Sequence, residues 1–276
     1  MTMRVVEQGA AMRIGALDQV LTGLRDAVRW DVHYSIAQEL GFDGVELGVR
    51  ANYDQTQLWD RMGRQEILRL SQQAGVVTSS VCLHSYWQYS FAHPDADIRV
   101  RARRIAEEAA QAIAEVGAKR VLIPLTCPDG VEQVAARERW VEGMRSCAEA
   151  AESNGVFFCL ENVGKPFGNT PERIVEIVDS INSPAVEVYY DPGNAVHNGL
   201  DPLRGIELLG KRIGQVHVKE IGGKLLGDGA VPWPQIIAGL RMVGYDGWLV
   251  LETDPTDDPK TAALQNLRTL QKLVQA

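Results

Sequence analysis

Residues 156–164 read VFFCLENVG, an almost wholly apolar run that gives way abruptly to Glu161. A continuous apolar run of this kind is typical of a parallel strand covered on both faces, whereas a half-exposed strand alternates between apolar and polar residues. We therefore predict a buried parallel strand over 156–161. A carboxylate at the end of such a strand needs a partner, and the other strand ends supply candidates.

Similar runs recur along the whole chain, and each is followed by a segment with helical periodicity. The predicted strands are 12–17, 44–47, 76–83, 120–125, 156–161, 186–191, 213–220 and 247–252. The predicted helices are 28–40, 57–74, 96–116, 131–153, 171–181, 202–209, 233–242 and 259–274. Strands that alternate with helices indicate parallel pairing through right-handed crossovers.

Glycines punctuate this alternation, because each lies just past a helical segment, where a helix end favours a residue tolerant of positive φ. They are Gly41, Gly75, Gly117, Gly155, Gly210 and Gly244. The phrases ELGFDGVEL (39–47) and MVGYDGWLV (242–250) repeat one helix–Gly–aromatic–Asp–Gly–strand pattern. Eight such units that close on themselves form a (β/α)8 TIM barrel, and with no linker between them we predict one α/β domain over residues 1–276.

An open doubly wound sheet is the competing architecture. It usually has fewer strands and carries a G-x-G-x-x-G turn after the first of them. The corresponding segment here, GALDQVLTG (15–23), lacks that fingerprint. The barrel is therefore the favoured fold.

Composition excludes several classes of partner. The net charge of −8 disfavours nucleic acid and anionic membrane surfaces, both of which attract basic faces. No apolar run approaches the roughly 20 residues of a membrane span. The N-terminal MTMRVVEQGAAMRIG (1–15) has no apolar secretory segment. Because Cys82, Cys127, Cys147 and Cys159 form no CxxC pair, we expect reduced thiols and a cytoplasmic location.

Four candidate metal ligands stand at the ends of four consecutive strands. Glu161 ends the fifth strand, Asp191 the sixth and Glu252 the eighth, and His217 lies near the end of the seventh. The active site of such a barrel lies at these carboxyl ends, and neighbouring strands are about 4.8 Å apart. Any one of these residues alone is more ordinary as a loop residue, turn residue or core histidine, but the conjunction indicates a metal site.

Three carboxylates and one imidazole suit a divalent cation of intermediate hardness. We expect Mn²⁺ first, with Co²⁺, Fe²⁺, Mg²⁺ or Zn²⁺ as alternatives.

The segments ENVG (161–164), YYDPGN (189–194), HVKE (217–220) and LVLET (249–253) resemble the xylose-isomerase-like TIM-barrel superfamily of sugar isomerases and epimerases. The chain is most similar to the D-tagatose 3-epimerase and L-ribulose-phosphate or L-xylulose-phosphate 3-epimerase branch. The resemblance implies that Glu161, Asp191, His217 and Glu252 bind the metal. It also implies that the two glutamates are the acid/base pair, and that Asn194 contacts substrate.

That resemblance implies a reaction on a small ketose or ketose phosphate. The metal would chelate the C2 carbonyl and C3 hydroxyl oxygens and stabilise an enediolate. Glu161 and Glu252 would remove and return the C3 proton on opposite faces, which inverts the centre. A single-face transfer from C1 to C2 would give isomerisation instead, and it uses the same ligands.

Other activities share the barrel. A metal-dependent dehydratase or lyase of a keto-sugar or keto-inositol, as in the inosose dehydratases, would expel a β-hydroxyl from the same enediolate. A hydrolase of the endonuclease IV type needs more histidines at strand ends than the five in this chain supply. A catalytically silent binding protein is disfavoured by the intact ligand set.

Further residues are candidates for substrate contact. Lys219 lies on the same side of its strand as His217, so it either reaches substrate or pairs with a ligand carboxylate. Lys224 lies in the glycine-rich GGKLLGDG (222–229), which is either a phosphate-binding loop or a plain mobile loop.

The ends of the second and third strands add three more candidates. His84 and Trp87, in HSYWQYS (84–90), would contact or stack on a sugar, with helix capping and ordinary packing as the alternatives. Glu46 ends the second strand and is predicted to line the pocket.

One departure from the family concerns the segment after Glu161. Free-ketose epimerases carry a second acidic residue a few positions further on, whereas NVGKPFGN (162–169) has none. The absence of that residue favours a different chemical group at the C1 end of the substrate. Barrels of this family often pair, so a homo-oligomer is also compatible with the sequence, although no stripe of residues identifies an interface.

Overall fold

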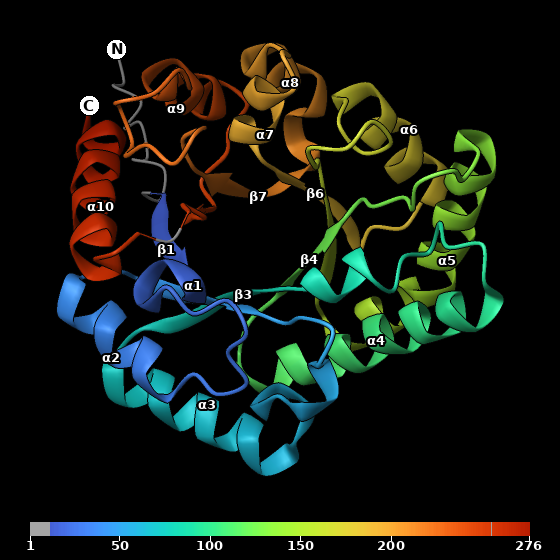
Figure 1. Ribbon diagram of the computed structural model, residues 1–276, viewed down its shortest axis with the longest axis horizontal. Helices are drawn as coiled ribbons and strands as arrows, with labels where there is room; N and C mark the ends of the chain where they lie inside the picture. Colours follow the sequence, from blue (N-terminus) through green and yellow to red (C-terminus); the bar gives the residue numbers. More distant parts are fainter. Residues whose placement is uncertain (1–11, 255) are drawn as a thin grey trace, which may run out of the picture.

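The computed structural model describes residues 12–254 and 256–276, and its eight parallel strands close into a barrel in sequence order (Figure 1). The strands are β1 (Arg13–Leu17), β2 (Gly44–Gly48), β3 (Val77–Cys82), β4 (Arg120–Pro124), β5 (Phe157–Glu161), β6 (Val186–Tyr190), β7 (Ile213–Val218) and β8 (Trp248–Leu251). The barrel closes where Ile14 of β1 pairs with Leu249 of β8. The predicted (β/α)8 barrel is confirmed, and every predicted strand is present within two residues at each end.

The helices form the outer ring around these strands (Figure 1). Eight of them were predicted: α2 (Asp31–Leu40), α3 (Arg61–Ala74), α4 (Ala96–Glu115), α5 (Gln133–Asn154), α6 (Pro171–Ile181), α8 (Pro202–Leu209), α9 (Trp233–Met242) and α10 (Pro259–Gln275). Two short helices directly after strands were not predicted, α1 (Asp18–Thr22) and α7 (Pro192–His197). Short 3₁₀ segments cover 53–55, 57–59, 84–87 and 210–212.

Local sequence signals set where the helices begin and end. Asp60 caps α3 by accepting a hydrogen bond from the Gly63 amide at 2.7 Å, and Gly75 ends that helix with φ 65°. Loss of such an N-cap costs about 1 kcal/mol. Helix α6 ends differently, because the residue with positive φ there is Asn182. The side chain of Asn tolerates that conformation better than other non-glycine residues do.

The two repeated phrases meet where the barrel closes. Gly41 and Gly244 have φ 92° and 79°, as their places after helices α2 and α9 predict. Asp43 accepts a hydrogen bond from the Ile14 amide at 2.8 Å, which ties the first phrase to β1. A Cβ on Gly44 would lie 2.7 Å from the ring of Trp248, so the close approach of the two copies requires glycine there.

The fully buried side chains of the barrel strands are of two kinds, apolar and polar. Strands β4 and β5 contribute fully buried residues such as Ile123 and Phe158. Near the carboxyl ends of the strands the fully buried side chains include polar ones, among them Glu46, Gln215 and His217. Buried polar groups need partners, so this layer is where a functional site is expected.

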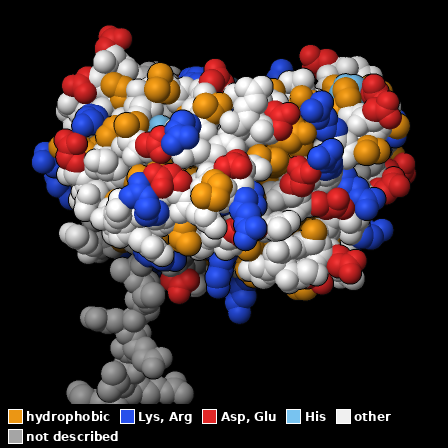
Figure 2. Space-filling model, turned by 90° about the horizontal axis from the view of Figure 1, so that it is seen from below, with side chains coloured by type: hydrophobic (Ala, Val, Ile, Leu, Met, Phe, Trp, Pro, Cys, Tyr) orange, Lys and Arg blue, Asp and Glu red, His pale blue; other side chains and the backbone are white. Residues whose placement is uncertain are grey.

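Outside the barrel, acidic and basic side chains intermix on the face drawn in Figure 2, and hydrophobic side chains stand mostly singly. No helix in 12–254 or 256–276 is both long enough and apolar enough to span a membrane. The prediction that the N-terminus lacks a secretory segment rests largely on residues 1–11, which lie outside the described residues.

Candidate metal centre and substrate cavity

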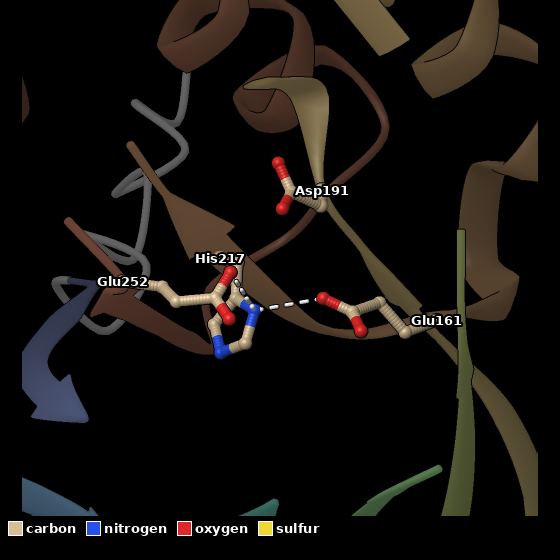
Figure 3. A group of neighbouring side chains, drawn as sticks. All are labelled: Glu161, Asp191, His217 and Glu252. Atoms are coloured by element: carbon tan, nitrogen blue, oxygen red, sulfur yellow. Dashed lines mark hydrogen bonds and ion pairs between the residues drawn. The ribbon is translucent and has the colours of Figure 1, made fainter. Parts of the chain in front are cut away.

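The four residues predicted to bind a metal lie together at the barrel mouth. Glu161 is the last residue of β5, His217 lies in β7, and Asp191 and Glu252 directly follow β6 and β8. One donor atom from each lies within 4.8 Å of the donor atoms of the other three. Figure 3 shows their side chains pointing toward one another.

His217 links this cluster to the barrel interior. Its Nδ1 atom lies 2.9 Å from Glu161 Oε1 and 3.1 Å from Glu252 Oε2. Its Nε2 atom lies 2.7 Å from Glu46 Oε2. Without a bound cation, the charges of Glu252 and Glu46 outweigh the effect of burial and hold the pKa of His217 well above its ordinary value, so both ring nitrogens carry protons. Release of the Nδ1 proton to a cation would leave Nε2 donating to Glu46 and the lone pair of Nδ1 directed at the cluster, which is the tautomer that a metal ligand at Nδ1 needs.

Glu46 does not line the substrate pocket as the sequence suggested. It is the third residue of β2, so its side chain lies inside the barrel below the mouth and is fully buried. Its Oε1 atom accepts hydrogen bonds from Ser80 Oγ at 2.6 Å and Tyr189 Oη at 2.9 Å. Gln215 Nε2 donates in turn to Ser80 Oγ and Tyr189 Oη. This network holds the carboxylate against the ring of His217.

Lys219 joins two of the cluster carboxylates. Its Nζ atom lies 2.7 Å from Asp191 Oδ2, as an ion pair without hydrogen-bond alignment, and 2.8 Å from Glu252 Oε2 as a hydrogen bond. The alternative that Lys219 pairs with a ligand carboxylate is therefore realised, and its side chain also faces the cavity described below.

The two glutamates consequently have different proton affinities. Burial raises the pKa of Glu161 to about 7, an effect that the hydrogen bond from His217 only partly offsets. Burial also raises the pKa of Glu252, but the charges of His217 and Lys219 outweigh it and hold this pKa well below its ordinary value. The difference arises because Lys219 contacts Glu252 and not Glu161.

Asp191 combines the two roles that its sequence context allows. Its Oδ1 atom accepts a hydrogen bond from the Asn194 amide at 2.9 Å, so it caps helix α7. Its Oδ2 atom remains for the cluster. The side chain of Asn162, the residue after Glu161, makes two hydrogen bonds of 2.7 Å to the backbone of Asp191. Its Nδ2 group donates to the carbonyl oxygen of Asp191, and its Oδ1 atom accepts from the amide of Asp191. The ends of β5 and β6 are thereby locked together.

A cavity of about 480 Å³ opens above the cluster at the carboxyl ends of the strands. Five of the predicted site residues line it: Asn194, Lys219, His84, Trp87 and Glu252. Lys224 does not, because its exposed side chain lies further out on the loop between β7 and α9.

His84 and Trp87 occupy the β3 side of this cavity. Burial, reinforced by the nearby charge of Arg50, lowers the pKa of His84 to about 4, so its ring is neutral near pH 7. The side chain of Trp87 is 51% exposed, which is high for so large an apolar group and leaves its ring available at the rim.

Comparison with known proteins places the chain in a family. The family description "Xylose isomerase-like TIM barrel" matches residues 34–273. The chain belongs to this family. Among its relatives, L-ribulose-5-phosphate 3-epimerase UlaE from Escherichia coli (strain SMS-3-5 / SECEC) is 25% identical over 242 residues, which is 83% of this chain and 84% of the relative.

Two solved structures of similar shape extend the comparison. D-Psicose 3-epimerase from Clostridium cellulolyticum H10, solved with D-tagatose, has a TM-score of 0.83 at 20% identity and covers 95% of this chain and 99% of its own. The 3-keto-D-glucoside 4-epimerase YcjR from E. coli has a TM-score of 0.80 at 18% identity, with 95% and 99% coverage. These likenesses establish the xylose isomerase-like fold.

The donor set of this family member fits a divalent cation. Three carboxylates and one imidazole nitrogen converge on one point, and the cluster is negative in spite of Lys219. The Oδ2 atom of Asp191 is buried and has no aligned hydrogen-bond donor among the described residues. A cation at the centre of the four donors would satisfy that oxygen and the lone pair of His217.

Sequence reasoning missed several residues that line the cavity. They are Gln19, Arg25, Arg50, Gly164, Gly193, His197, Glu220, Ile221, Gly222 and Asp254. Gln19 and Arg50 each lie two residues past the end of a strand, β1 and β2. The strand-end rule that located the cluster on β5–β8 gave Glu46 on β2, whereas the side chains that reach the cavity from β1 and β2 lie two positions beyond the strand ends and outside that rule.

Proposed function

We propose that the protein is a divalent-metal-dependent sugar epimerase that acts on a ketose or ketose phosphate. The observation that carries the proposal is the placement of Glu161 and Glu252, whose carboxylates lie 2.9 Å and 3.1 Å from one atom, His217 Nδ1, and come from strands three apart. The relative UlaE and two structural neighbours, D-psicose 3-epimerase and L-ribulose 3-epimerase, are named as sugar 3-epimerases, which are isomerases, and we assign the chain to that class.

Glu161, Asp191, His217 and Glu252 would hold the metal. When bound there, the cation supplies electrostatic stabilisation of the negative charge that develops on the substrate oxygens. Carboxylate and imidazole ligands favour Mn²⁺, with Co²⁺, Fe²⁺, Mg²⁺ and Zn²⁺ as alternatives. Glu46 orients the ring of His217 toward the donors.

The two glutamates divide the proton transfer. In one direction of the reaction, Glu252 is the base, because the charge of Lys219, 2.8 Å away, helps to keep it ionised. It takes the proton from C3 and leaves an enediolate. Glu161, whose pKa burial raises to about 7, gives a proton back on the opposite face. In the reverse direction the roles exchange.

The remaining residues of the mouth bind substrate. Lys219 and Asn194 lie beside the cluster, so we assign them to the reacting end of the sugar. His84, being neutral, contacts a hydroxyl group, and Trp87 offers a ring for stacking. Lys224 is kept as a candidate contact on the loop between β7 and α9.

Hydrogen exchange tests this function directly. Mn²⁺-loaded protein in D₂O is mixed with ketopentoses and ketohexoses, free and phosphorylated, and followed by proton NMR. The expected result is deuterium at C3 together with a new epimer, and loss of both in Glu161→Gln and Glu252→Gln. Deuterium at C1 with an aldose product would instead identify an isomerase.

A dehydratase or lyase of a keto-sugar is the second candidate. It would use the same enediolate, and the structural neighbour YcjR is named for a keto-sugar substrate, a 3-keto-D-glucoside. The same experiment separates the two, since a lyase gives exchange followed by loss of water.

A further inference from the structure

The residues lining the cavity fall into two groups by strand and by charge. Asn194, Lys219 and Glu252 follow β6–β8 and surround the metal cluster. Gln19, Arg25, Arg50, His84 and Trp87 follow β1–β3. Strands four apart in a closed eight-stranded barrel lie opposite each other, so β2 faces β6 and β3 faces β7. The proposed proton transfer uses only the β5–β8 side and leaves the arginines of the other side without a role.

Arg50 is fixed at the rim with most of its donors unused. Its Nη2 group donates to Gln19 Oε1 at 2.9 Å, and its Nε group donates to the carbonyl oxygen of Arg25. These bonds use two of the five N–H groups of a guanidinium, and the other three have no acceptor among the described residues. The guanidinium is thus positioned by neutral acceptors and keeps its capacity to bind an anion.

The ion pair of Arg50 is weak, although the buried carboxyl group of Asp18 also lies within range of its charge. The ion pair that it makes within 12–254 and 256–276 is with Asp26, at 3.4 Å, and the side chain of Asp26 is 80% exposed. Exposed pairs of this kind contribute little. Arg25 adds a second positive charge at the rim, since its contact with Asp254 is longer still, at 3.7 Å.

The strand end that carries Arg50 is rigid. The buried carboxylate of Asp18 accepts hydrogen bonds from Trp30 Nε1 at 2.6 Å and from the Gly48 amide at 3.1 Å. A Cβ on Gly48 would lie 3.0 Å from Asp18 Oδ1, so the backbone two residues before Arg50 is held in close contact. A preorganised donor loses less entropy on binding than a mobile one.

We propose that Arg50, assisted by Arg25, binds an anionic group at the end of the ketose remote from the metal, and that this group is a phosphate monoester. The three unused N–H donors of Arg50 match the three terminal oxygens of a phosphate better than they match a neutral hydroxyl. A carboxylate group on the substrate would accept the same charge-assisted hydrogen bonds from Arg50 and is the alternative ligand. The inference rests on the proposed function, because it places the reacting end of the substrate at the metal cluster.

Kinetics with matched substrates test it. The rate of C3 deuterium exchange is measured for ketopentoses, their 5-phosphates and ketohexuronates, with the wild type, Arg50→Gln, Arg50→Lys and Arg25→Gln. Arg50→Gln is expected to lower kcat/KM for the phosphate about 10- to 100-fold, mainly through KM, since hydrogen bonds to charged groups contribute that much. The free ketopentose should change less than about 3-fold.

The other variants sharpen this result. Arg50→Lys keeps the charge and loses the fork of donors, so an intermediate loss is expected. Arg25→Gln should give a smaller loss than Arg50→Gln. Arg268→Gln, which removes an exposed arginine of α10 outside the cavity, is the control and should change nothing.

A binding measurement separates this inference from the proposed function. A pentitol 5-phosphate carries no carbonyl and cannot react, so calorimetry reports its binding alone. If no sugar exchanges hydrogen but this compound binds the wild type and fails to bind Arg50→Gln, the anion site stands and the epimerase proposal is wrong.

Two results would overturn the anion site. The first is equal exchange of free and phosphorylated ketoses with no effect of Arg50→Gln. The second is loss of phosphate selectivity in Lys224→Gln and not in Arg50→Gln, which would place the anion on the loop between β7 and α9. If Arg50→Gln lowers kcat/KM for ketohexuronates and not for the 5-phosphates, the anion site is supported and its ligand is a carboxylate.

Discussion

Substitution of Glu46 by glutamine removes a negative charge from beneath His217 while preserving the shape of the side chain. Glu46 is fully buried and receives three hydrogen bonds, from Ser80 at 2.6 Å, Tyr189 at 2.9 Å and His217 at 2.7 Å. Glutamine offers one oxygen and one amide nitrogen in place of two oxygens. The hydroxyl groups of Ser80 and Tyr189 rotate to suit the amide, but the N–H of the histidine ring does not.

The expected cost follows from this mismatch. Where the amide nitrogen faces Nε2, the proton of His217 moves to Nδ1 and the lone pair that faces the cluster is lost. Loss of an outer partner of a metal-binding histidine lowers metal affinity about 10- to 100-fold, or about 1.4–2.7 kcal/mol. The free energy of unfolding should fall by about 1–3 kcal/mol, because a buried bond to a charged group is weakened.

Competition with a chelator measures the affinity for Mn²⁺ in the wild type, Glu46→Gln and Glu187→Gln. Glu187 lies on β6 and pairs with Arg120 at 2.9 Å, away from the cluster, so its variant controls for the chemical change. Tyr189→Phe, which removes one donor to Glu46 and keeps the ring, should have a smaller effect. A Glu46→Gln protein that is folded and binds Mn²⁺ within 3-fold of the wild type would refute the positioning role.

Three further predictions concern the cluster and the rim. Glu161→Gln and Glu252→Gln should each lower the rate of C3 exchange at least about 100-fold, because each removes a general acid or base; a residual rate near that of the wild type in either would remove that glutamate from the mechanism. Lys219→Met should raise the pKa of Glu252, since the lysine holds it down, and so move the acidic limb of the pH–rate profile to higher pH; an unmoved limb contradicts this. Burial raises the pKa of Asp18 to about 7, above its value in the unfolded chain, so its protonation favours the folded state. That contribution is fully present below about pH 4 and is lost as the pH rises through about 7, so urea unfolding of the wild type and Asp18→Asn should show a difference in stability that changes by up to about 4 kcal/mol over this range, and a constant difference would show that Asp18 does not titrate there.

The parts of the molecule that follow from topology were readable in the sequence. Parallel strands have all their carboxyl ends at one edge, so locating the ends of β5, β6 and β8 was enough to bring Glu161, Asp191 and Glu252 together. The order of the elements also located six glycines at helix ends, and all six have positive φ in the structure. Both inferences needed only the order of the elements and the register of each residue within its own segment.

The parts that depend on depth and on partners were not readable. Glu46 was expected at the mouth because the predicted strand ended at 47, whereas β2 continues to Gly48 and the side chain of Glu46 is fully buried beneath His217. Arg25 and Arg50 lie in loops, where no periodicity marks a position as inward or outward. Helix α7 has six residues and begins at a capping aspartate followed by proline, so its sequence was interpreted as a turn.

The arrangement of the cavity also bears on how such a protein changes during evolution. The residues assigned to proton transfer and metal binding come from 157–252, and those assigned to the far end of the substrate come from 19–87. Mutations or recombination in the first third of the gene would therefore alter which substrate is bound without disturbing the reaction. Glu46 is the exception, because it belongs to the recognition third yet supports His217. A chimera that exchanges this third between relatives should therefore inherit new selectivity and keep turnover only if the donor sequence also supplies a carboxylate at position 46.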